Sequence, residues 1–453
     1  MALLNSLGSG RAAVSKPTTK ITRTTAGLRC AAVSDLGMRR ASNQDSLAML
    51  LADDESQWRS RGHLFVVADG MGAHAAGELA SQLATDNIPH TYQKRRDLPA
   101  CEAIVAAVQD ANGRIYAKGQ NTVDFHGMGT TCSCLVLLPE GAVAAHVGDS
   151  RVYRLRGHAL EQLTFDHSLV WEMAAAGQAS EDEVPAYVPK NVITRSLGPH
   201  PTVKVDLEGP FPLHAGDKFL VCSDGLTGPL SPHVIGMILA SLPPEDAADT
   251  LVDLANLLGG PDNITTVVAE ISDPQLLGQK NGRGWTDVVA PIPNGGHSRE
   301  DWAFGAALLL SLAAGALLAA LDYAKAAVGC AAAAVAIAVA WALRRSLGSD
   351  GLGSGIRGSH GKAPYRKYQV APSPQSIEML SDIVRQLEDL EAQRSWPFDW
   401  QGVHADRHRA HKAIAAGDYP AAVVAYSSAV RRLMQAVRAH RPDPLSDSGI
   451  NLG

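Results

Sequence analysis

The sequence contains few cysteines, and their spacing excludes a cysteine-based zinc site. No Cys-x-x-Cys pair occurs among them, whereas a structural zinc site uses paired ligands at short spacing. Two of them, Cys132 and Cys134, would point to the same face of one strand. We therefore expect reduced thiols in the core and a reducing compartment. The six cysteines are Cys30, Cys101, Cys132, Cys134, Cys222 and Cys330.

The chain also lacks an excess of basic residues. Its formal net charge is −6 and its pI is near 6.2. With no global positive charge to neutralise phosphates, we expect no nucleic-acid partner. Residues 1–28 contain no acid and also lack the apolar segment of a secretory signal. We interpret residues 1–28 as a disordered N-terminal tail, with a transit peptide as the alternative.

What the sequence does contain is a long region of alternating short apolar runs and turn clusters, residues 29–271. Helical spacing occurs from Ile104 to Ile115 and from Ala247 to Leu258. Several runs follow one another without a helix between them, so we expect an α+β domain of two antiparallel sheets with helices outside. The expected strands are Cys30–Val33, Leu47–Leu51, Leu64–Ala68, Cys132–Leu138, Ala142–Val147, Val152–Leu155, Lys218–Cys222 and Ile264–Ile271.

Two uncharged stretches follow a predicted linker at 272–300. Residues 303–321 and 326–343 are each long enough to cross a bilayer. A buried alanine-rich helical hairpin is the alternative, because Ala is only weakly apolar. We favour two transmembrane helices, with the flanking parts of the chain on the cytoplasmic side of the inner (cell) membrane. That side is indicated by the basic residues Arg344, Arg345, Arg357, Lys362, Arg366 and Lys367.

The remaining sequence predicts a linker and a helical tail. Residues 346–375 combine Gly, Ser and basic residues, which would also suit an anionic lipid surface. Residues 376–440 predict helices, and Ala410–Ala429 resembles one tetratricopeptide unit with a Gly417-Asp418-Tyr419 turn. An ordinary helical hairpin is the alternative, because one repeat cannot bury its own face. Such a tail is a candidate site for a protein partner.

Acidic residues recur at the ends of the predicted strands. Asp69 is followed by Gly70-Met71-Gly72, but the third glycine comes two residues late for a dinucleotide-binding turn. An EF-hand is excluded because the following positions carry no oxygen ligands. Any one such acid is most simply a turn residue. Five in similar positions predict a shared site: Asp45, Asp69, Asp149, Asp224 and Asp262.

Five carboxylates in one cleft require cations to neutralise them. Ligands that are all oxygen favour Mg²⁺ or Mn²⁺ over zinc. Two such ions activate a water molecule and clamp a phosphoryl oxygen, so that no protein nucleophile is needed. The sequence offers none, since it has neither a Cys-x5-Arg phosphate loop nor Gly-x-Ser-x-Gly.

Seven motifs, in order, resemble those of the metal-dependent protein phosphatases (PPM or type 2C) in their bacterial form. The resemblance covers roughly residues 29–271 and implies a β-sandwich flanked by helices, in four αββα layers. It also implies hydrolysis of phosphoserine and phosphothreonine in proteins, with two Mn²⁺ or Mg²⁺ ions and a third, weaker one. The motifs are Gly37–Ser46, Asp69–His74 with Gly77-Glu78, Gly129–Thr131, Gly148–Arg151, Thr164–Ser168, Ser223–Leu226 and Asp262–Thr265.

The same resemblance implies roles for single residues. Asp69 would bridge two metals and act in catalysis, and Gly70 would offer its carbonyl. Arg40, rather than Arg39, would bind phosphate. Gln44 stands where the family usually has Glu, which removes a charge. The other metal ligands are expected to be Asp45, Asp149, Asp224 and Asp262, and the residues supporting the ligands from behind to be Gln44, His74 and Asn263.

These roles predict an enzyme that reverses serine/threonine kinase signalling at a membrane. Its expected partners are phosphorylated proteins, a serine/threonine kinase among them. The alternative is a catalytically weak, phosphatase-like scaffold that binds phosphorylated partners at the membrane.

Overall fold

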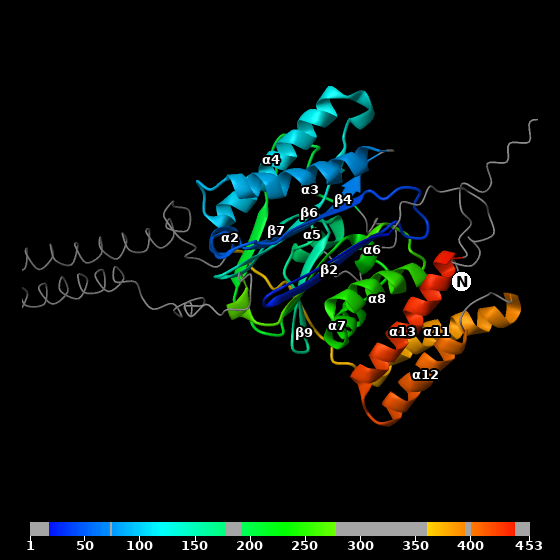
Figure 1. Ribbon diagram of the computed structural model, residues 1–453. Helices are drawn as coiled ribbons and strands as arrows, with labels where there is room; N and C mark the ends of the chain where they lie inside the picture. Colours follow the sequence, from blue (N-terminus) through cyan, green and yellow to red (C-terminus); the bar gives the residue numbers. More distant parts are fainter. Residues whose placement is uncertain (1–17, 73–74, 178–191, 278–359, 395–399, 440–453) are drawn as a thin grey trace, which may run out of the picture. The chain divides into compact units, whose positions relative to one another are not determined.

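The computed structural model describes residues 18–72, 75–177, 192–277, 360–394 and 400–439 (Figure 1). The chain forms two compact units, one made of residues 1–288 with 358–453 and the other of residues 289–357. All described residues belong to the first unit, so the C-terminal tail and the N-terminal region fold together.

The first unit is built on two antiparallel sheets. The larger sheet has the strand order β1-β2-β12-β11-β8-β9-β13, and the smaller has β10-β7-β6-β4-β3 with β5 beside β4. The strands of the larger sheet are β1 Thr19–Thr25, β2 Leu28–Asp35, β12 Ile264–Ile271, β11 Lys218–Cys222, β8 Arg151–Arg156, β9 Ala159–Gln162 and β13 Arg366–Gln369. Those of the smaller are β10 Asp206–Phe211, β7 Gly141–Val147, β6 Cys132–Leu138, β4 His63–Met71, β3 Asp45–Leu50 and β5 Gly129–Thr130.

Alternate residues of both sheets share one apolar core. Phe65 and Val67 of β4 enter it from the smaller sheet, and Phe219 and Val221 of β11 enter it from the larger. All four side chains are fully buried. The period-2 spacing of these residues places them on the inner face of their strands, which is why the two sheets stack.

Helices cover the outer faces of this sandwich (Figure 1). Helices α3 and α4 lie against the smaller sheet, and α7 and α8 lie against the larger, so the expected α+β class is confirmed. The helices of this part are α2 Glu55–Arg61, α3 Ala76–Lys94, α4 Ala100–Asn121, α5 Leu169–Ala175, α6 Asp224–Thr227, α7 Pro232–Ser241 and α8 Pro244–Leu257, with short 3₁₀ turns at Val123–Phe125 and Pro274–Leu276.

Several predicted elements are confirmed residue for residue. The bounds of β6, β11 and β12 are those expected from their apolar runs, and the two helical patterns lie in α4 and, apart from Leu258 just past its end, in α8. The five described cysteines are buried free thiols. Strand β1 was not expected, because it lies within the predicted N-terminal tail. Most of its side chains are exposed, so it carries no apolar alternation and is held by its pairing with β2.

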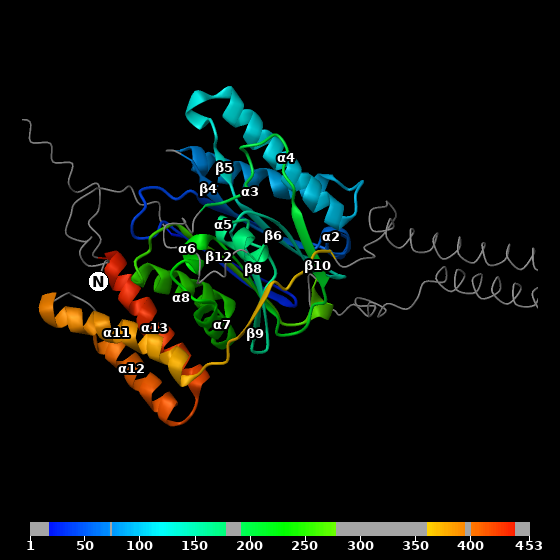
Figure 2. The same cartoon turned by 180° about the vertical axis from the view of Figure 1, so that it is seen from behind.

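The predicted linker 346–375 is also partly folded, since it contains β13. This strand pairs with β9 at the edge of the larger sheet, where the yellow segment of Figure 2 runs. The Arg366 guanidinium lies 3.9 Å from the centre of the Trp171 ring, and Lys367 Nζ lies 2.9 Å from Glu161 Oε1. These two basic side chains therefore contact the domain itself. The sequence does not predict this strand, because four residues that include two charged ones show no apolar pattern.

The predicted transmembrane helices, residues 303–321 and 326–343, lie outside the described residues. Among the helices that the structure does describe, none combines the length and apolar character needed to cross a bilayer.

The tail consists of α11 Pro374–Arg394, α12 Trp400–Ala415 and α13 Tyr419–Ala439, and it packs on α7 and α8 (Figure 1). Ile377, Leu380 and Val384 of α11 join the same apolar cluster as the outer face of the larger sheet. Gly417 has φ +75° at the turn after α12, and the Asp418 side chain caps α13 by accepting from Ala421 N. This helical pair thus buries its face against the domain, and its likeness to a tetratricopeptide unit stays a prediction.

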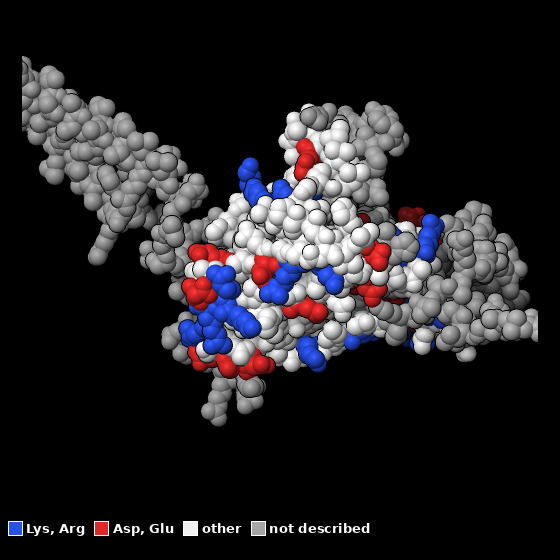
Figure 3. Space-filling view, turned by 90° about the horizontal axis from the view of Figure 1, so that it is seen from above, with Lys and Arg blue, Asp and Glu red and all other residues white. Residues whose placement is uncertain are grey.

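Acidic and basic side chains lie interspersed on the face seen in Figure 3. Ion pairs of the described residues include Arg59 with Glu55 and Arg114 with Asp110. Exposed pairs of this kind contribute little to stability.

The contact between α7 and the residue after β13 gives a test of the tail's position. A Cβ at Gly236 in α7 would lie 2.5 Å from Val370 Cγ1. Gly236→Ala should therefore lower the free energy of unfolding by about 1–3 kcal/mol through overpacking. The control is Gly113→Ala in α4, where a Cβ would meet nothing within 4 Å and should instead stabilise by roughly 0.5–1 kcal/mol. Urea unfolding of both variants measures this, and an equal gain in both would contradict the described packing of Val370 on α7.

Candidate metal centre

Asp69 lies at the end of β4, where hydrogen bonds fix its backbone. Its N–H donates to Thr131 Oγ1 at 2.9 Å, and its carbonyl accepts from Thr131 N at 2.8 Å. The Thr130 hydroxyl donates to the same carbonyl. Because both backbone groups of Asp69 are held, its carboxylate is positioned by the sheet and not by a flexible loop.

Glycines allow another segment to cross β4 directly after Asp69. A Cβ at Gly70 would lie 2.1 Å from the carbonyl oxygen of Gly77, and one at Gly77 would lie 2.8 Å from the Gly70 carbonyl. Only glycine at both positions lets the start of α3 pass so close to the strand. The structure thus provides a packing reason for the glycines of this motif. Of the predicted supporting residues, His74 lies outside the described residues.

Asp45 and Asp224 join Asp69 from neighbouring strand ends. Asp45 is paired in register with Asp69 across β3 and β4. Asp224 begins α6 directly after β11, and the preceding Ser223 donates its hydroxyl to Asp45 Oδ2 at 2.8 Å. Ser223 Oγ in turn accepts from Thr265 N at 2.9 Å. One serine therefore ties the two sheets together at the point where their acids meet.

Asp262 and Arg40 form an ion pair at the same edge. The Arg40 guanidinium donates to Asp262 Oδ2 at 2.5 Å, and the Arg40 side chain is 47% exposed. Asp262 Oδ1 accepts from Asn263 N at 2.8 Å. An arginine beside the carboxylates, with half its side chain in solvent, is accessible to an anion that approaches the cluster.

Asn263 and Gln44 hold the loop that carries Arg40. The Asn263 amide donates to the carbonyls of Leu36 and Ser42 at 2.9 and 3.0 Å, and its oxygen accepts from Gln44 N at 2.9 Å. The Gln44 carbonyl accepts from Gly70 N at 3.1 Å. Both residues thus hold backbone segments next to the acids, Asn263 through its side-chain amide and Gln44 through its main chain.

The acids raise one another's pKa. Burial is the largest cause at each of four positions, and the negative charges of the neighbours add to it. The pKa of Asp69 is held well above its ordinary value by burial and by Asp45, Asp224 and Asp149. Burial and neighbouring acids also raise the pKa values of Asp45, Asp149 and Asp224. Such mutual repulsion is relieved when a cation lies among the carboxylates.

The donor set fits hydrated divalent ions. The Oδ1 atoms of Asp45, Asp149 and Asp224 are buried and accept no hydrogen bond, which costs free energy unless a cation takes them up. Among the described residues, no group of three or more His, Cys, Asp or Glu side chains is placed to hold a metal ion. Mg²⁺ does not require one, because it usually keeps several waters and takes one or two carboxylates. Oxygen donors of this kind suit Mg²⁺ and Mn²⁺.

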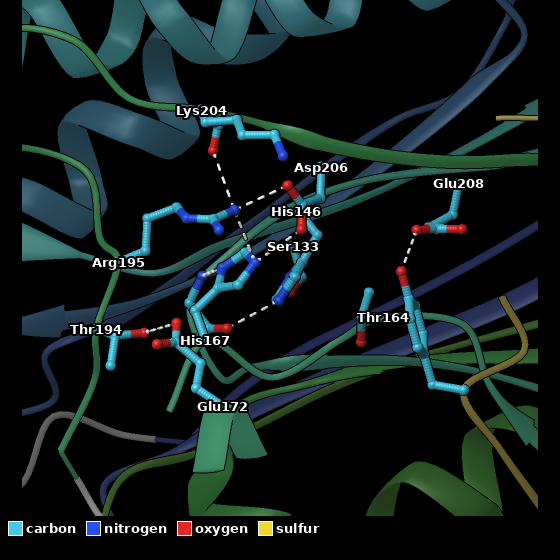
Figure 4. A network of polar contacts seen from close by, with 12 residues as sticks. Ser133, His146, Thr164, His167, Glu172, Thr194, Arg195, Lys204, Asp206 and Glu208 are labelled. Carbon is cyan, nitrogen blue, oxygen red and sulfur yellow. Dashed lines mark hydrogen bonds and ion pairs between the residues drawn. The ribbon is translucent and has the colours of Figure 1, made fainter. Parts of the chain in front are cut away.

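A buried histidine network fixes the strand end before Asp149 (Figure 4). Burial lowers the pKa of His146 to about 3, so the ring is neutral. Its Nε2 donates to the Gly148 carbonyl at 2.8 Å, which leaves Nδ1 to accept from the Ser133 hydroxyl. Gly148 N donates to His167 Nδ1 at 2.9 Å, and a Cβ at Gly148 would lie 2.6 Å from Thr131 Cβ. The two histidines therefore hold the backbone of Gly148 by hydrogen bonds.

The network continues to two residues that the sequence does not indicate. His167 Nε2 donates to Asp206 Oδ2 at 2.9 Å, and Arg195 donates to Asp206 Oδ1 at 2.8 Å. Burial alone would raise the pKa of Asp206, but these partners lower it to about 2. Nothing in the sequence marked Arg195 or Asp206. Ser223 and Thr131, by contrast, stand inside two of the sequence motifs, Ser223–Leu226 and Gly129–Thr131.

Comparison with known proteins gives a consistent result. Residues 38–259 match the family described as protein phosphatase 2C. The chain is 35% identical over 245 residues to protein phosphatase PhpP of Streptococcus pneumoniae, which covers 53% of this chain and 96% of that protein. It is 34% identical over 242 residues to serine/threonine phosphatase stp of Listeria monocytogenes, covering 52% and 93%. A crystal structure of the catalytic domain of serine threonine protein phosphatase PstP in complex with 2 manganese ions has 35% identity, covers 54% of this chain and 99% of that chain, and gives a TM-score of 0.46.

If the carboxylates bind metal ions, one substitution should have opposite effects on the stability of the metal-free protein and of the metal-bound protein. Asp69→Asn removes a repelling charge, so without metal it should raise the free energy of unfolding by about 1 kcal/mol. Wild type at 100 times the Kd of Mn²⁺ should gain about 2.7 kcal/mol, and the variant should lose most of that gain. Thermal unfolding in EDTA and in Mn²⁺ measures both effects. Asp124→Asn, remote in sequence from all five acids, is the control, and an undiminished Mn²⁺ response in Asp69→Asn would contradict the assignment.

Proposed function

The chain belongs to the protein phosphatase 2C family, and from that premise we propose that it hydrolyses phosphoserine and phosphothreonine in proteins with two bound Mn²⁺ or Mg²⁺ ions. The observation that carries this proposal is the set of buried carboxylate oxygens without hydrogen-bond partners beside a half-exposed arginine. Acids arranged in this way attract divalent cations, and an arginine beside them attracts phosphate.

Some residues of the site would bind the metal ions, and another would bind the substrate. Asp45, Asp69, Asp224 and Asp262 would hold the pair of ions, together with the Gly70 carbonyl. When bound, the ions supply an activated water and neutralise the phosphoryl oxygens. Asp149 would hold a third ion with Asp224.

Arg40 would orient the phosphate. Its planar guanidinium can donate to two phosphate oxygens at once. Arg40 lies on the loop that Asn263 holds by hydrogen bonds. Asp262, its partner in the structure, keeps the guanidinium directed to the acid cluster. Gln44 would support the ligands without adding charge, so binding of one ion should be weaker than with Glu in its place.

Activity on phosphopeptides tests the proposal directly. The full chain with Mn²⁺ should release phosphate from a phosphothreonine peptide, and Arg40→Ala should raise KM by about tenfold or more, the value of a hydrogen bond to a charged group. Arg39→Ala is the matched control and should change KM by less than about twofold.

A folded, Mn²⁺-binding wild type that leaves phosphoserine and phosphothreonine peptides intact would exclude the enzyme. The scaffold would then be favoured, since it needs only phosphopeptide binding. An equal effect of Arg39→Ala and Arg40→Ala would instead contradict the role given to Arg40.

The enzyme is further proposed to be tethered to the cell membrane through residues 303–321 and 326–343. Their length and lack of charge support this. The fold adds an argument on topology: β12 before this region and β13 after it belong to the same sheet. A segment whose two ends return to one folded unit crosses a membrane an even number of times. Two crossings satisfy that condition and leave the phosphatase domain and the tail on the same side, which the basic residues Arg344 and Arg345 after the second stretch indicate is the cytoplasmic one.

Fractionation tests the tether. The full chain should sediment with membranes and resist extraction at high salt, because apolar spans do not depend on charge. A variant in which residues 303–343 are replaced by a Gly/Ser linker of equal length should move to the supernatant and keep its phosphatase activity. Full-length protein in the supernatant would favour the buried hairpin.

A further inference from the structure

Helix α8 carries a row of acidic residues. They form ion pairs with basic residues of three other elements, β1, β2 and α13. Arg29 of β2 pairs with Glu245 at 3.0 Å, and Lys20 of β1 pairs with Asp249 at 2.6 Å. The tail helix α13 supplies the other two cations, Arg431 to Asp246 at 2.5 Å and Arg438 to Asp253 at 2.7 Å. The tail therefore docks on α8 through matched charges as well as apolar packing.

Arg438 differs from Arg431 in what else it contacts. Its guanidinium also lies 3.2 Å from Oδ2 of Asp35, the last residue of β2. Both carboxylates that it joins are nearly buried, Asp35 at 7% and Asp253 at 5% exposure. The partner of Arg431, Asp246, has a side chain that is 40% exposed. Ion pairs with buried carboxylates are costly to break, because the remaining charge is left uncompensated.

Asp35 is the anchor of the turn that leads to Arg40. Its Oδ1 accepts from Gly37 N at 2.9 Å and from the Asn256 amide at 3.0 Å. Its Oδ2 accepts from the Thr18 hydroxyl at 2.7 Å. Burial alone would raise the pKa of Asp35, but these hydrogen bonds and the charge of Arg438 hold it below its ordinary value.

The turn that follows Asp35 packs closely against the segment that carries Asp262 and is hydrogen-bonded to it. Gly37 has φ +80°, and a Cβ there would lie 2.1 Å from the Asp262 carbonyl oxygen. Met38 N and Arg39 N both donate to the Gly260 carbonyl, at 2.9 and 3.2 Å. A displacement of Asp35 would therefore shift the backbone on both sides of the ion pair between Arg40 and Asp262.

We propose that Arg438 is a positioning residue for phosphate binding: the docked tail, through Asp35, keeps the loop of Arg40 in place against Asp262. The inference rests on the proposed function, since it deepens the role given to Arg40. Both Arg438 and Asp35 lie outside residues 38–259, which match the family. Release of the tail from α8 would lower phosphate affinity without any change at the carboxylates.

Binding of inorganic phosphate to the full, Mn²⁺-loaded chain tests this without relying on turnover. Arg438→Gln should weaken the affinity for orthophosphate by about fivefold, the size of coupling found along contiguous contacts. Arg431→Gln, which removes an ion pair from the same two helices, should change it by less than about twofold. Arg438→Lys should recover part of the loss, since it keeps the charge, and Asp253→Asn should leave the affinity unchanged, because the contact with Asp35 remains.

A double substitution separates positioning from general destabilisation. If Arg438 acts through Arg40, Arg438→Gln should cost nothing further in an Arg40→Ala background. Equal effects of Arg438→Gln and Arg431→Gln, or an undiminished effect in that background, would overturn the inference. A wild type that binds orthophosphate but hydrolyses no phosphopeptide would refute the proposed function alone, because the affinity series still decides the role of Arg438.

Discussion

Repulsion among buried carboxylates is the constraint on which the rest of this structure depends. Asp45, Asp69, Asp149 and Asp224 each have a raised pKa because burial and their neighbours oppose ionisation. A chain does not gather such groups by their own attraction, so the backbone has to hold them. The two sheets do so by ending their strands at one edge, where each acid is fixed by the hydrogen bonds of its own strand or turn.

The side chains that hold three of these acids in place by hydrogen bonds are accordingly neutral. Ser223 joins Asp45 to β12, Thr131 holds the backbone of Asp69, and His146 holds Gly148 before Asp149. Glycines permit the close crossings that this requires, as between Gly70 and Gly77. Neutral side chains add no charge of their own. The attraction of the site for cations therefore comes from the carboxylates.

Much of the fold and of the site was predictable from the sequence, because both follow from local patterns. Apolar runs such as Cys132–Leu138 define buried strands on their own, and acids such as Asp224 stand out when they directly follow such a run. Arg195 and Asp206 could not be found in this way, because their importance lies in contact with His167, which is distant along the chain. Strands β1 and β13 were not predicted, for a related reason. They are polar edge strands whose position is set by the neighbouring strand with which they pair. The contact of Arg438 with Asp35 joins residues that no motif relates.

The position of β13 has a consequence for how the protein is made. Tyr368 pairs with Leu160, so the edge of the larger sheet is completed by residues synthesised long after β9. Until the ribosome has delivered β13 and the tail, the open edge of β9 and the apolar outer faces of α7 and α8 are uncovered, a state in which nascent chains are prone to wrong associations. The hydrophobic residues 303–343 emerge within that interval. Closure of the larger sheet therefore follows the synthesis of residues 303–343, and the edge of β9 is covered only when the chain beyond them has been made.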